Sequence, residues 1–226
     1  MDLRGDAAVV LLSGGQDSTT CLAWALKRFA RVHTLAIDYG QRHRIELEAA
    51  SEIARMAGVA HALVPCDSFR ALGGNALTGD EAVTAGVRAE NQLPNTFVPG
   101  RNLIFLTLAA AFAYQRGSAN LVTGVCETDY SGYPDCRDET MTALQESLRR
   151  GMDAPFVIHT PLMRLSKADT VRLAQDLGAL PLLAHSHTCY NGLIPPCGAC
   201  PACQLRAKGF AEAGIADPLL ERLARA

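Results

Sequence analysis

The sequence has no excess of charge of either sign and no apolar run long enough to span a bilayer. Its 226 residues carry 21 basic and 23 acidic side chains, a formal net charge of −2. A near-neutral chain has no general attraction for nucleic acid or anionic membranes, so any phosphate site must be local. The longest apolar run, 103–114, is interrupted by Thr107 and falls far short of the ~20 residues of a membrane span. We therefore predict no nucleic-acid partner and no membrane segment.

The opening residues also do not resemble a leader sequence. The opening residues MDLRGD place two acids ahead of a six-residue apolar stretch, which fits neither a secretory signal nor a transit peptide. In a chain without a secretory signal, eight cysteines are expected to be thiols or metal ligands rather than a disulfide framework. We predict a cytoplasmic protein.

Four of these cysteines fall within fifteen residues near the C-terminus. They are Cys189, Cys197, Cys200 and Cys203, and they include two CxxC spacings. Four thiolates complete one tetrahedral zinc site and leave no position open for substrate, which predicts a structural zinc ion. An iron–sulfur cluster, or His187 in place of one cysteine, is the alternative.

Short apolar runs alternate with helical patterns along most of the chain. The expected strands are 7–12, 32–37, 61–65, 120–123 and 155–158, and the expected helices are 19–28, 44–57, 102–116, 138–150, 167–177 and 204–213. This alternation predicts an α/β fold with a doubly wound, Rossmann-like parallel sheet that is covered on both faces. Ligands of such folds lie at the carboxyl ends of the strands.

Two stretches break this alternation. The interval 67–99 is rich in Gly, Asn, Thr and Pro, and loops of that length are uncommon unless they are lids, binding loops or disordered. After residue 177 the sequence becomes rich in Pro and Cys. We predict an α/β domain over 1–184 and a zinc-binding segment with C-terminal helices over 185–226.

The first expected strand ends in the turn SGGQDSTT, residues 13–20. Gly14 and Gly15 allow the backbone to approach a ligand closely. The helix expected to begin near Ser18 or Thr19 offers unpaired N–H groups and the positive end of its dipole. Together these features predict a phosphate site.

Side chains of the same turn extend this prediction. The lysine of the GxxxxGK[ST] pattern is absent, so the hydroxyls of Ser13, Ser18 and Thr19 must supplement the backbone donors. Asp17 either caps the helix or helps to hold Mg²⁺ on the phosphates.

Two cations are expected at the starts of later helices. They are Arg101, in VPGRN, and Lys167, which follows Ser166 in a capping-box pattern with Asp169. A cation at a helix N-terminus is disfavoured by up to ~1 kcal/mol, so both positions favour a bound anion on the edge that carries the glycine turn. Two solvated surface cations are the alternative.

The segment GVCETDYSGYPDCRD, 124–138, follows the fourth expected strand and should border the same crevice. Carboxylates accept hydrogen bonds from ring N–H and amine groups, and tyrosines stack on rings. The segment therefore favours binding of a polar heterocycle, although a well-capped turn has the same composition. The residues expected to contact it are Asp129, Tyr130, Tyr133, Asp135 and Arg137.

The pattern SGGxDS between a strand and a helix resembles the pyrophosphate loop of the adenine-nucleotide α-hydrolase-like ATP pyrophosphatases. Further stretches, in order along nearly the whole chain, are similar to the 7-cyano-7-deazaguanine synthase family. They are DYGQRH from Asp38, NTFVPGRN from Asn95, DYSGYPDCR from Asp129, TPL from Thr160 and TCYNG from Thr188.

This resemblance implies an ATP-dependent enzyme that converts 7-carboxy-7-deazaguanine and ammonia to the nitrile 7-cyano-7-deazaguanine. It implies ATP with Mg²⁺, one structural zinc ion and a homodimer. The implied catalytic residues are Asp17, Arg101 and Lys167. The implied ATP site consists of Leu12, Ser13, Gly14, Gly15, Gln16, Asp17, Ser18, Thr19, Arg101 and Lys167. No amidotransferase domain fits in the remaining chain, so free ammonia is the expected nitrogen donor.

Three other interpretations stay open at this point. A tRNA thiolase shares the loop and can carry zinc, but it needs an RNA surface that the charge balance does not favour. A nucleotide-binding sensor would use the same loop without chemistry. Cys136 is a possible covalent nucleophile, for which no activating partner can be placed from sequence.

Overall fold

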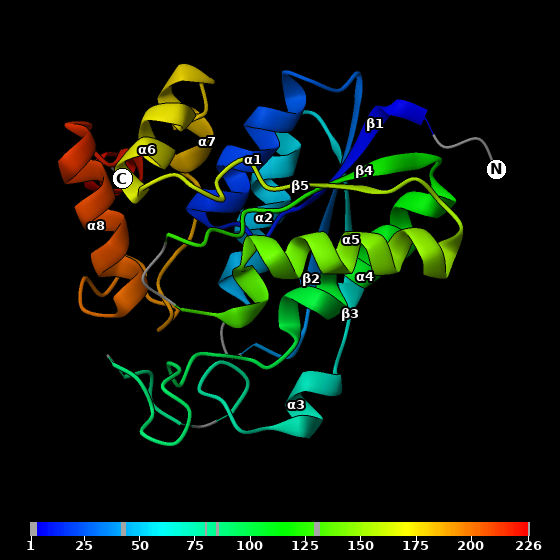
Figure 1. The fold of residues 1–226 in the computed structure, drawn as a ribbon. Coiled ribbons are helices and arrows are strands. Elements are labelled where there is room, and N and C mark those ends of the chain that lie inside the picture. Colours follow the sequence, from blue (N-terminus) through cyan, green and yellow to red (C-terminus); the bar gives the residue numbers. More distant parts are fainter. Residues whose placement is uncertain (1–3, 42–43, 80, 85, 129–131, 226) are drawn as a thin grey trace.

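A five-stranded parallel sheet organises the chain. The computed structural model describes residues 4–41, 44–79, 81–84, 86–128 and 132–225. The strand order is β3-β2-β1-β4-β5, and every pair is parallel (Figure 1). The strands are β1 (Arg4–Leu11), β2 (Arg31–Asp38), β3 (Ala60–Pro65), β4 (Ser118–Val122) and β5 (Val157–His159). The predicted doubly wound α/β fold is confirmed, with the change of direction between β1 and β4.

Helices cover both faces of this sheet. Val9 and Val10 are fully buried, yet they belong to different core clusters because successive strand side chains point to opposite faces. The cluster around Val10 is closed by α1 and α2, and the cluster around Val9 is closed by α4 and α5. These helices are α1 (Gln16–Leu26), α2 (Ile45–Met56), α4 (Arg101–Gln115) and α5 (Asp138–Met152). Burial on both faces explains why the strands are apolar almost throughout.

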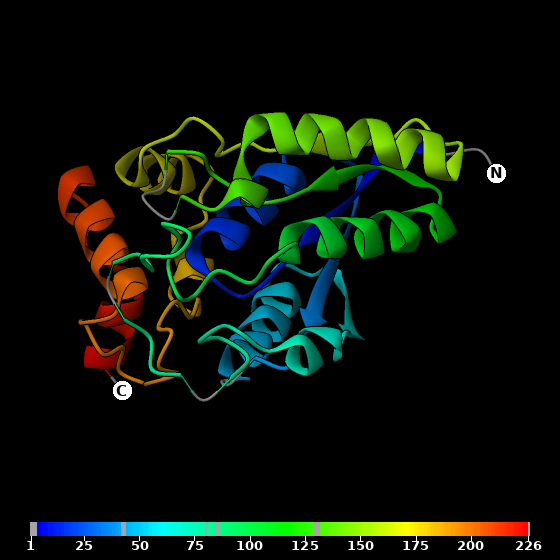
Figure 2. The same cartoon turned by 60° about the horizontal axis from the view of Figure 1, so that its bottom comes forward.

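The C-terminal helices pack at one end of the sheet, opposite the start of β1 (Figures 1 and 2). They are α6 (Lys167–Asp176), α7 (Leu180–Leu183), α8 (Pro201–Ala213) and α9 (Pro218–Ala224). Phe210 of α8 joins Val171 of α6 and Ala23 of α1 in one buried cluster, so this layer continues the core rather than standing apart from it. Among the described residues, no helix is both long and apolar enough to cross a membrane.

In its described residues, the interval that interrupts the alternation is mainly loop. It begins with α3 (Ser68–Leu72) and then, over the described part of 73–100, contains no further helix or strand (Figure 2). Asn75 is buried and its side-chain oxygen accepts from the backbone N–H groups of Leu77 and Thr78, each at 3.0 Å. Leu77 and Ala76 reach the carboxyl edge of the sheet. The described part of this loop therefore reaches the predicted ligand edge, and its role as a lid or a binding loop stays a prediction.

Several element boundaries differ from the predicted ones. Helix α1 begins at Gln16 instead of Ser18 or Thr19, because Gly15 already has the extended N-cap conformation. Helix α8 begins at Pro201, where a proline at the first turn costs no hydrogen bond. The short helices α3 and α7 were not predicted, and α9, one of the expected C-terminal helices, was predicted without bounds. Of these, α9 has a clear signal in hindsight, because Asp217 caps it and Pro218 follows.

The turn after β1 is held by close backbone packing. Gly14 has φ +80°, and a Cβ built there would lie 2.2 Å from the backbone oxygen of Glu46 in α2. A Cβ on Gly124, which follows β4, would lie 3.1 Å from the backbone nitrogen of Ser18 in α1. These two glycines therefore bring α1, α2 and β4 together around the turn.

We expect Gly14→Ala to lower the free energy of unfolding by more than about 2 kcal/mol, since alanine adds both left-handed strain and a steric overlap. Gly58→Ala is the matched control, because Gly58 has φ +67° but no atom within 4 Å of its ideal Cβ. It should lose only about 1 kcal/mol. Urea unfolding of both variants makes the comparison, and equal losses would show that α2 does not constrain the turn.

Candidate active site

A cavity of about 320 Å³ lies at the carboxyl edge of the sheet. Its apolar wall includes Leu35, Ile37 and Phe105, from β2 and α4. Its polar wall comes from the turn after β1, the first residues of α4 and α6, and 187–190. An apolar cavity with a few convergent polar groups is typical of a small-molecule site.

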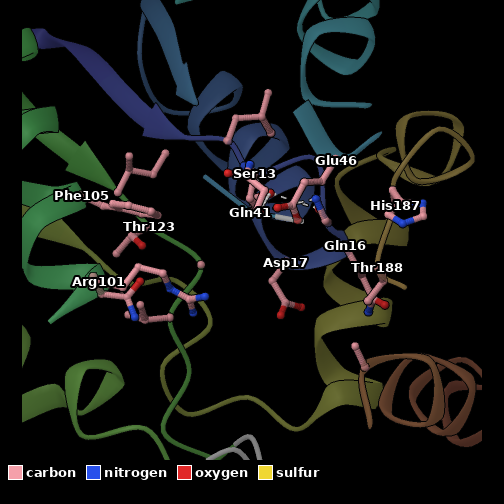
Figure 3. Close-up of a pocket in the computed structure, with 18 of the residues that line it drawn as sticks. Ser13, Gln16, Asp17, Gln41, Glu46, Arg101, Phe105, Thr123, His187 and Thr188 are labelled. Atoms are coloured by element: carbon pink, nitrogen blue, oxygen red, sulfur yellow. Dashed lines mark hydrogen bonds between the residues drawn. The ribbon is translucent and has the colours of Figure 1, made fainter. Parts of the chain in front are cut away.

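The polar groups face the cavity from two sides. Figure 3 shows Arg101 and Thr123 on one side, Gln16 and Thr188 on the other, and Asp17 between them. These residues come from four separate parts of the chain, which the change of direction between β1 and β4 brings to one place. This is where ligands of doubly wound sheets bind.

The turn after β1 offers the donors that an anion needs. Gly15 caps α1 without any side-chain hydrogen bond to the helix, so the first N–H groups of the helix are left for another acceptor. The hydroxyl oxygens of Ser13 and Ser18 lie 3.0 Å apart, and both residues line the cavity. The hydroxyls of Ser18 and Thr19 both donate to the Gly15 carbonyl, at 3.1 and 2.8 Å. Thr19 differs from Ser18 in that it does not line the cavity.

Three further positions of the predicted loop, Leu12, Gly14 and Gln16, differ in their relation to the cavity. Gly14 does not line the cavity, because its missing Cβ makes room for α2 rather than for a ligand. Leu12 lines the cavity and is almost fully buried. Gln16 is also buried and lines the cavity, and its Nε2 has no hydrogen-bond partner among the described residues.

Asp17 and Lys167 form an ion pair across the cavity. The Lys167 ammonium lies 2.9 and 3.1 Å from the two carboxylate oxygens of Asp17. Asp17 therefore does not cap α1, and that alternative was wrong. Lys167 is the first residue of α6, whose predicted cap is confirmed because Ser166 accepts from the backbone nitrogen of Asp169.

The side chain of Lys167 is also confined by α8. A Cβ on Gly209 of α8 would lie 2.5 Å from Cγ of Lys167. The glycine therefore lets α8 pack directly on the lysine stem, which limits how far the ammonium can move away from the cavity. Both predicted cations thus reach the predicted edge, and neither is a solvated surface charge.

Arg101 begins α4 on the opposite wall. Its guanidinium carbon lies 5.8 Å from the centre of the Tyr39 ring, within the range of a cation–π contact. Burial lowers the pKa of Arg101, but Tyr39 and other neighbours outweigh burial and raise it overall. The cavity therefore holds a permanent positive charge on this side.

Glu46, in the first turn of α2, places a second carboxyl group on the cavity wall. Burial raises its pKa to about 7, against the opposing effects of Arg101 and of a hydrogen bond with Gln41. The side-chain oxygen of Gln41 accepts from the backbone nitrogen of Tyr39 at 2.9 Å, which fixes the amide. Glu46 is therefore a group that can exchange a proton near neutral pH.

The residues predicted to bind a heterocycle separate into distinct environments. Tyr133 is buried, lines the cavity and stacks on Phe97 with ring centres 5.6 Å apart. Asp135 is buried and accepts from the backbone nitrogen of Asn102 at 3.0 Å, so it supports the start of α4. Arg137 points to solvent near Glu139. Asp129 and Tyr130 lie outside the described residues.

Cys136 lines the same cavity. Its sulfur lies 3.3 Å from the side-chain nitrogen of Asn102, the second residue of α4. An amide donor orients a thiol but does not deprotonate it. This contact therefore gives Cys136 a partner but does not itself activate the thiol.

The four clustered cysteines converge beside the cavity. The Sγ atoms of Cys189, Cys197, Cys200 and Cys203 all lie within 4.8 Å of one another. Sγ of Cys197 is 3.9 Å from Sγ of Cys203, close to the roughly 3.8 Å expected between thiolates that share one tetrahedral ion at about 2.3 Å. The cluster is thus compatible with a metal ion. His187 is not part of it, since its Nε2 lies 3.0 Å from the Cys189 carbonyl oxygen.

Comparison with known proteins identifies the family. The family model described as queuosine biosynthesis protein QueC matches residues 7–214. The chain belongs to the QueC family. A relative from Chromobacterium violaceum, named 7-cyano-7-deazaguanine synthase, is 64% identical over 220 residues, which cover 96% of this chain and 94% of the relative. A relative of the same name from Laribacter hongkongensis is 64% identical over 218 residues, with coverage of 96% and 95%.

The QueC match includes the glycine turn, both cations and all four clustered cysteines, because all lie within 7–214. Among solved structures, NMN synthetase from Francisella tularensis has a similar fold, with a TM-score of 0.52 and 15% sequence identity. That alignment covers 97% of this chain and 82% of the other. The structural likeness concerns the fold, whereas the sequence match establishes the family.

Glu46, Thr188 and Arg206 are among the residues of this region that were not predicted from the sequence. Glu46 and Thr188 lie in or next to stretches that carry the family resemblance, but nothing in their spacing indicates that they reach the cavity. Arg206, which is 4% exposed in α8, gives no sign in the sequence of its burial. Helical periodicity alone places an arginine at the surface.

We expect Glu46→Gln to stabilise the protein relative to the wild type as pH rises. The folded-state pKa of about 7 lies above the ordinary 4.5, so ionisation of Glu46 opposes folding. This penalty is absent below pH 4.5, grows up to pH 7 and is complete above it, reaching at most about 3 kcal/mol. Urea unfolding at pH 5.5 and pH 8 measures it, with Glu48→Gln on the exposed side of α2 as control. If the stability difference between Glu46→Gln and the wild type did not change with pH, the raised pKa of Glu46 would be contradicted.

Proposed function

We propose that this protein converts 7-carboxy-7-deazaguanine and ammonia to 7-cyano-7-deazaguanine at the expense of ATP. The observation that carries the proposal is the 64% identity, over 96% of the chain, to a 7-cyano-7-deazaguanine synthase. The cavity supports it, because a turn with the features of a phosphate site and an apolar wall meet in one place.

The ATP site of this proposal is the turn after β1. Backbone N–H groups at the start of α1, with Ser13 and Ser18, receive the phosphates, while Gly14 and Thr19 hold the turn in shape. Leu12, Gly15 and Gln16 complete the wall. The apolar wall that includes Leu35, Ile37 and Phe105 suits the adenine ring.

Asp17, Arg101 and Lys167 are the proposed catalytic residues. Arg101 and Lys167 face the phosphates from two walls and stabilise the charge that develops on departing pyrophosphate. Lys167 can move to the phosphates by leaving Asp17, whose carboxylate then has the chemistry to hold Mg²⁺. When bound, Mg²⁺ supplies charge neutralisation on the phosphate oxygens.

The chemistry proceeds through two activations. A carboxylate oxygen of the substrate attacks the α-phosphorus of ATP, pyrophosphate leaves, and an acyl-adenylate forms. Ammonia adds to the acyl carbon, AMP leaves and a proton is lost, which gives the amide. The amide oxygen attacks a second ATP in the same way, with loss of pyrophosphate and one proton. Departure of AMP and the last N–H proton leaves the nitrile.

Heterocycle recognition is proposed for the segment that contains Tyr133, which lines the cavity, unlike Asp135 and Arg137, the other described members of the predicted set. Asp129 and Tyr130 belong to the same segment and complete the proposed set with Asp135 and Arg137. Asp135 acts here by supporting the start of α4, and hence the position of Arg101.

The cysteine cluster is proposed to hold one structural zinc ion, in a segment 185–226 that follows the ATP-binding domain 1–184. Four thiols at tetrahedral spacing support this choice. A cytoplasmic location agrees with cysteines that stay reduced for metal binding. Homodimerisation is part of the proposal through the family resemblance.

The direct test mixes the purified protein with ATP, Mg²⁺, ammonium and 7-carboxy-7-deazaguanine. Mass spectrometry should detect first the amide and then the nitrile, with AMP and pyrophosphate as co-products. Lys167→Gln should lower kcat by about a hundredfold or more, because the pyrophosphate loses a fixed cation. Lys208→Gln is the control, since Lys208 is 65% exposed on α8.

Two outcomes would overturn the proposal. ATP binding without turnover of the heterocycle would indicate a nucleotide sensor. ATP turnover that depends on tRNA rather than on the deazapurine would indicate a thiolase.

Metal analysis tests the cysteine cluster separately. We expect about one zinc ion per chain and no visible absorption of an iron–sulfur cluster. Cys197→Ser should reduce the zinc content and lower the melting temperature, because one of four ligands is lost. The scattered, buried Cys21 provides the control, and Cys21→Ala should leave the zinc content unchanged.

A further inference from the structure

A buried arginine links the C-terminal helices to the candidate ATP site. Arg206 of α8 donates through Nε and one terminal nitrogen to both oxygens of Asp217, at 2.6 and 2.8 Å. Its other donors reach Ser186 at 2.8 Å, Thr188 at 3.0 Å and the Leu183 carbonyl at 3.3 Å. All five guanidinium hydrogens therefore have acceptors.

The two hydroxyls on this arginine are not equivalent. Ser186 accepts from Arg206 and donates to the Leu183 carbonyl at 2.7 Å, so it is fully used inside the protein. Thr188 accepts from the same arginine nitrogen, but its own hydroxyl hydrogen has no acceptor within the described part of the chain. Ser186 is 1% exposed, whereas Thr188 is half-buried and lines the cavity.

The position of Thr188 relative to the turn after β1 is fixed by its neighbour. The backbone nitrogen of His187 donates to the Gly14 carbonyl at 2.8 Å, and the ideal Cβ of Gly15 would lie 3.6 Å from the His187 carbonyl oxygen. Thr188 therefore stands beside the N-terminus of α1, on the side of the cavity opposite Arg101 (Figure 3).

We infer that the Thr188 hydroxyl donates a hydrogen bond to a phosphate oxygen of ATP and of departing pyrophosphate, and that Arg206 orients it for this contact. The inference rests on the proposed function, which puts the phosphates at the turn after β1. Because Arg206 occupies one lone pair of Thr188 Oγ1, the hydroxyl hydrogen must point elsewhere, and Thr188 lines the cavity in which the proposed phosphates would lie. Thr188 thus extends the phosphate site into the segment that carries the cysteines.

Calorimetric titration of inorganic pyrophosphate with Mg²⁺ into the full-length, zinc-loaded protein tests this contact. Thr188→Val keeps the shape but removes the donor, and it should weaken pyrophosphate binding at least about tenfold, which corresponds to 1.4 kcal/mol. Thr188→Ser keeps the donor and should restore the affinity. Binding of AMP, which lacks the β- and γ-phosphates, should not change in either variant.

Ser186→Ala is the matched control, because it removes the other hydroxyl on Arg206. It should lower the melting temperature without the tenfold loss of pyrophosphate affinity. Thr188→Ala removes the same donor and leaves a smaller side chain, so it should weaken pyrophosphate binding as Thr188→Val does. Melting curves and zinc content show that each variant is folded.

The outcomes separate this inference from the proposed function. If the wild type binds pyrophosphate and Thr188→Val binds it equally well, the hydroxyl does not contact phosphate and the inference is wrong. Equal weakening of AMP and pyrophosphate by Thr188→Val would also overturn it, because the effect would then be general to the site. If the wild type binds neither ATP nor pyrophosphate, the proposed function itself fails.

Discussion

The close packing of α2 on the turn after β1 is the constraint on which the site depends. Because Gly14 has no side chain, the backbone of α2 can occupy the space beside the turn, and the turn can then direct the start of α1 toward the carboxyl edge of the sheet. The Gly14 carbonyl in turn receives His187 from the C-terminal segment. The absence of a side chain at Gly14 thus allows α2, the turn after β1 and the segment at His187 to meet at one place. Gly14 is therefore needed for the packing of α2, and it affects the ligand site only through that packing.

The charges in the cavity suit the proposed polyphosphate ligand. Lys167 is held by Asp17, Arg101 is surrounded by tyrosines, and Glu46 carries a proton over part of the neutral range. A polyphosphate brings several negative charges, which would be repelled by two ionised carboxylates and attracted by two cations. Pairing one carboxylate with a lysine and protonating the other lowers this repulsion. The ion pair and the protonated Glu46 therefore limit the negative charge that a polyphosphate would meet in the cavity.

The sequence predicted much of this arrangement because its signals are local. Strand and helix periods, the SGGxDS turn and the Ser166–Asp169 cap all depend on residues that are neighbours in the chain, and the structure confirms the sheet and both cations at its carboxyl edge. Such local signals could not predict contacts between residues that are far apart in the chain. The pairing of Asp17 with Lys167 joins residues 150 positions apart, and Gly14 was assigned to ligand approach when it is needed for α2. Likewise, the start of α1 was misplaced because glycine has no side chain that marks an N-cap.

The ion pair of Arg206 with Asp217 limits where the chain can be shortened. Asp217 also caps α9, through a hydrogen bond from the backbone nitrogen of Leu219 at 2.9 Å. Asp217 lies beyond residue 214, where the family match ends, yet its loss would leave a buried guanidinium without a counter-ion, at a cost of several kcal/mol. The folding unit is therefore longer than the stretch by which the family is recognised. Expression fragments trimmed to the matched boundary would fail for electrostatic reasons, whereas a tag placed after α9 leaves the pair intact.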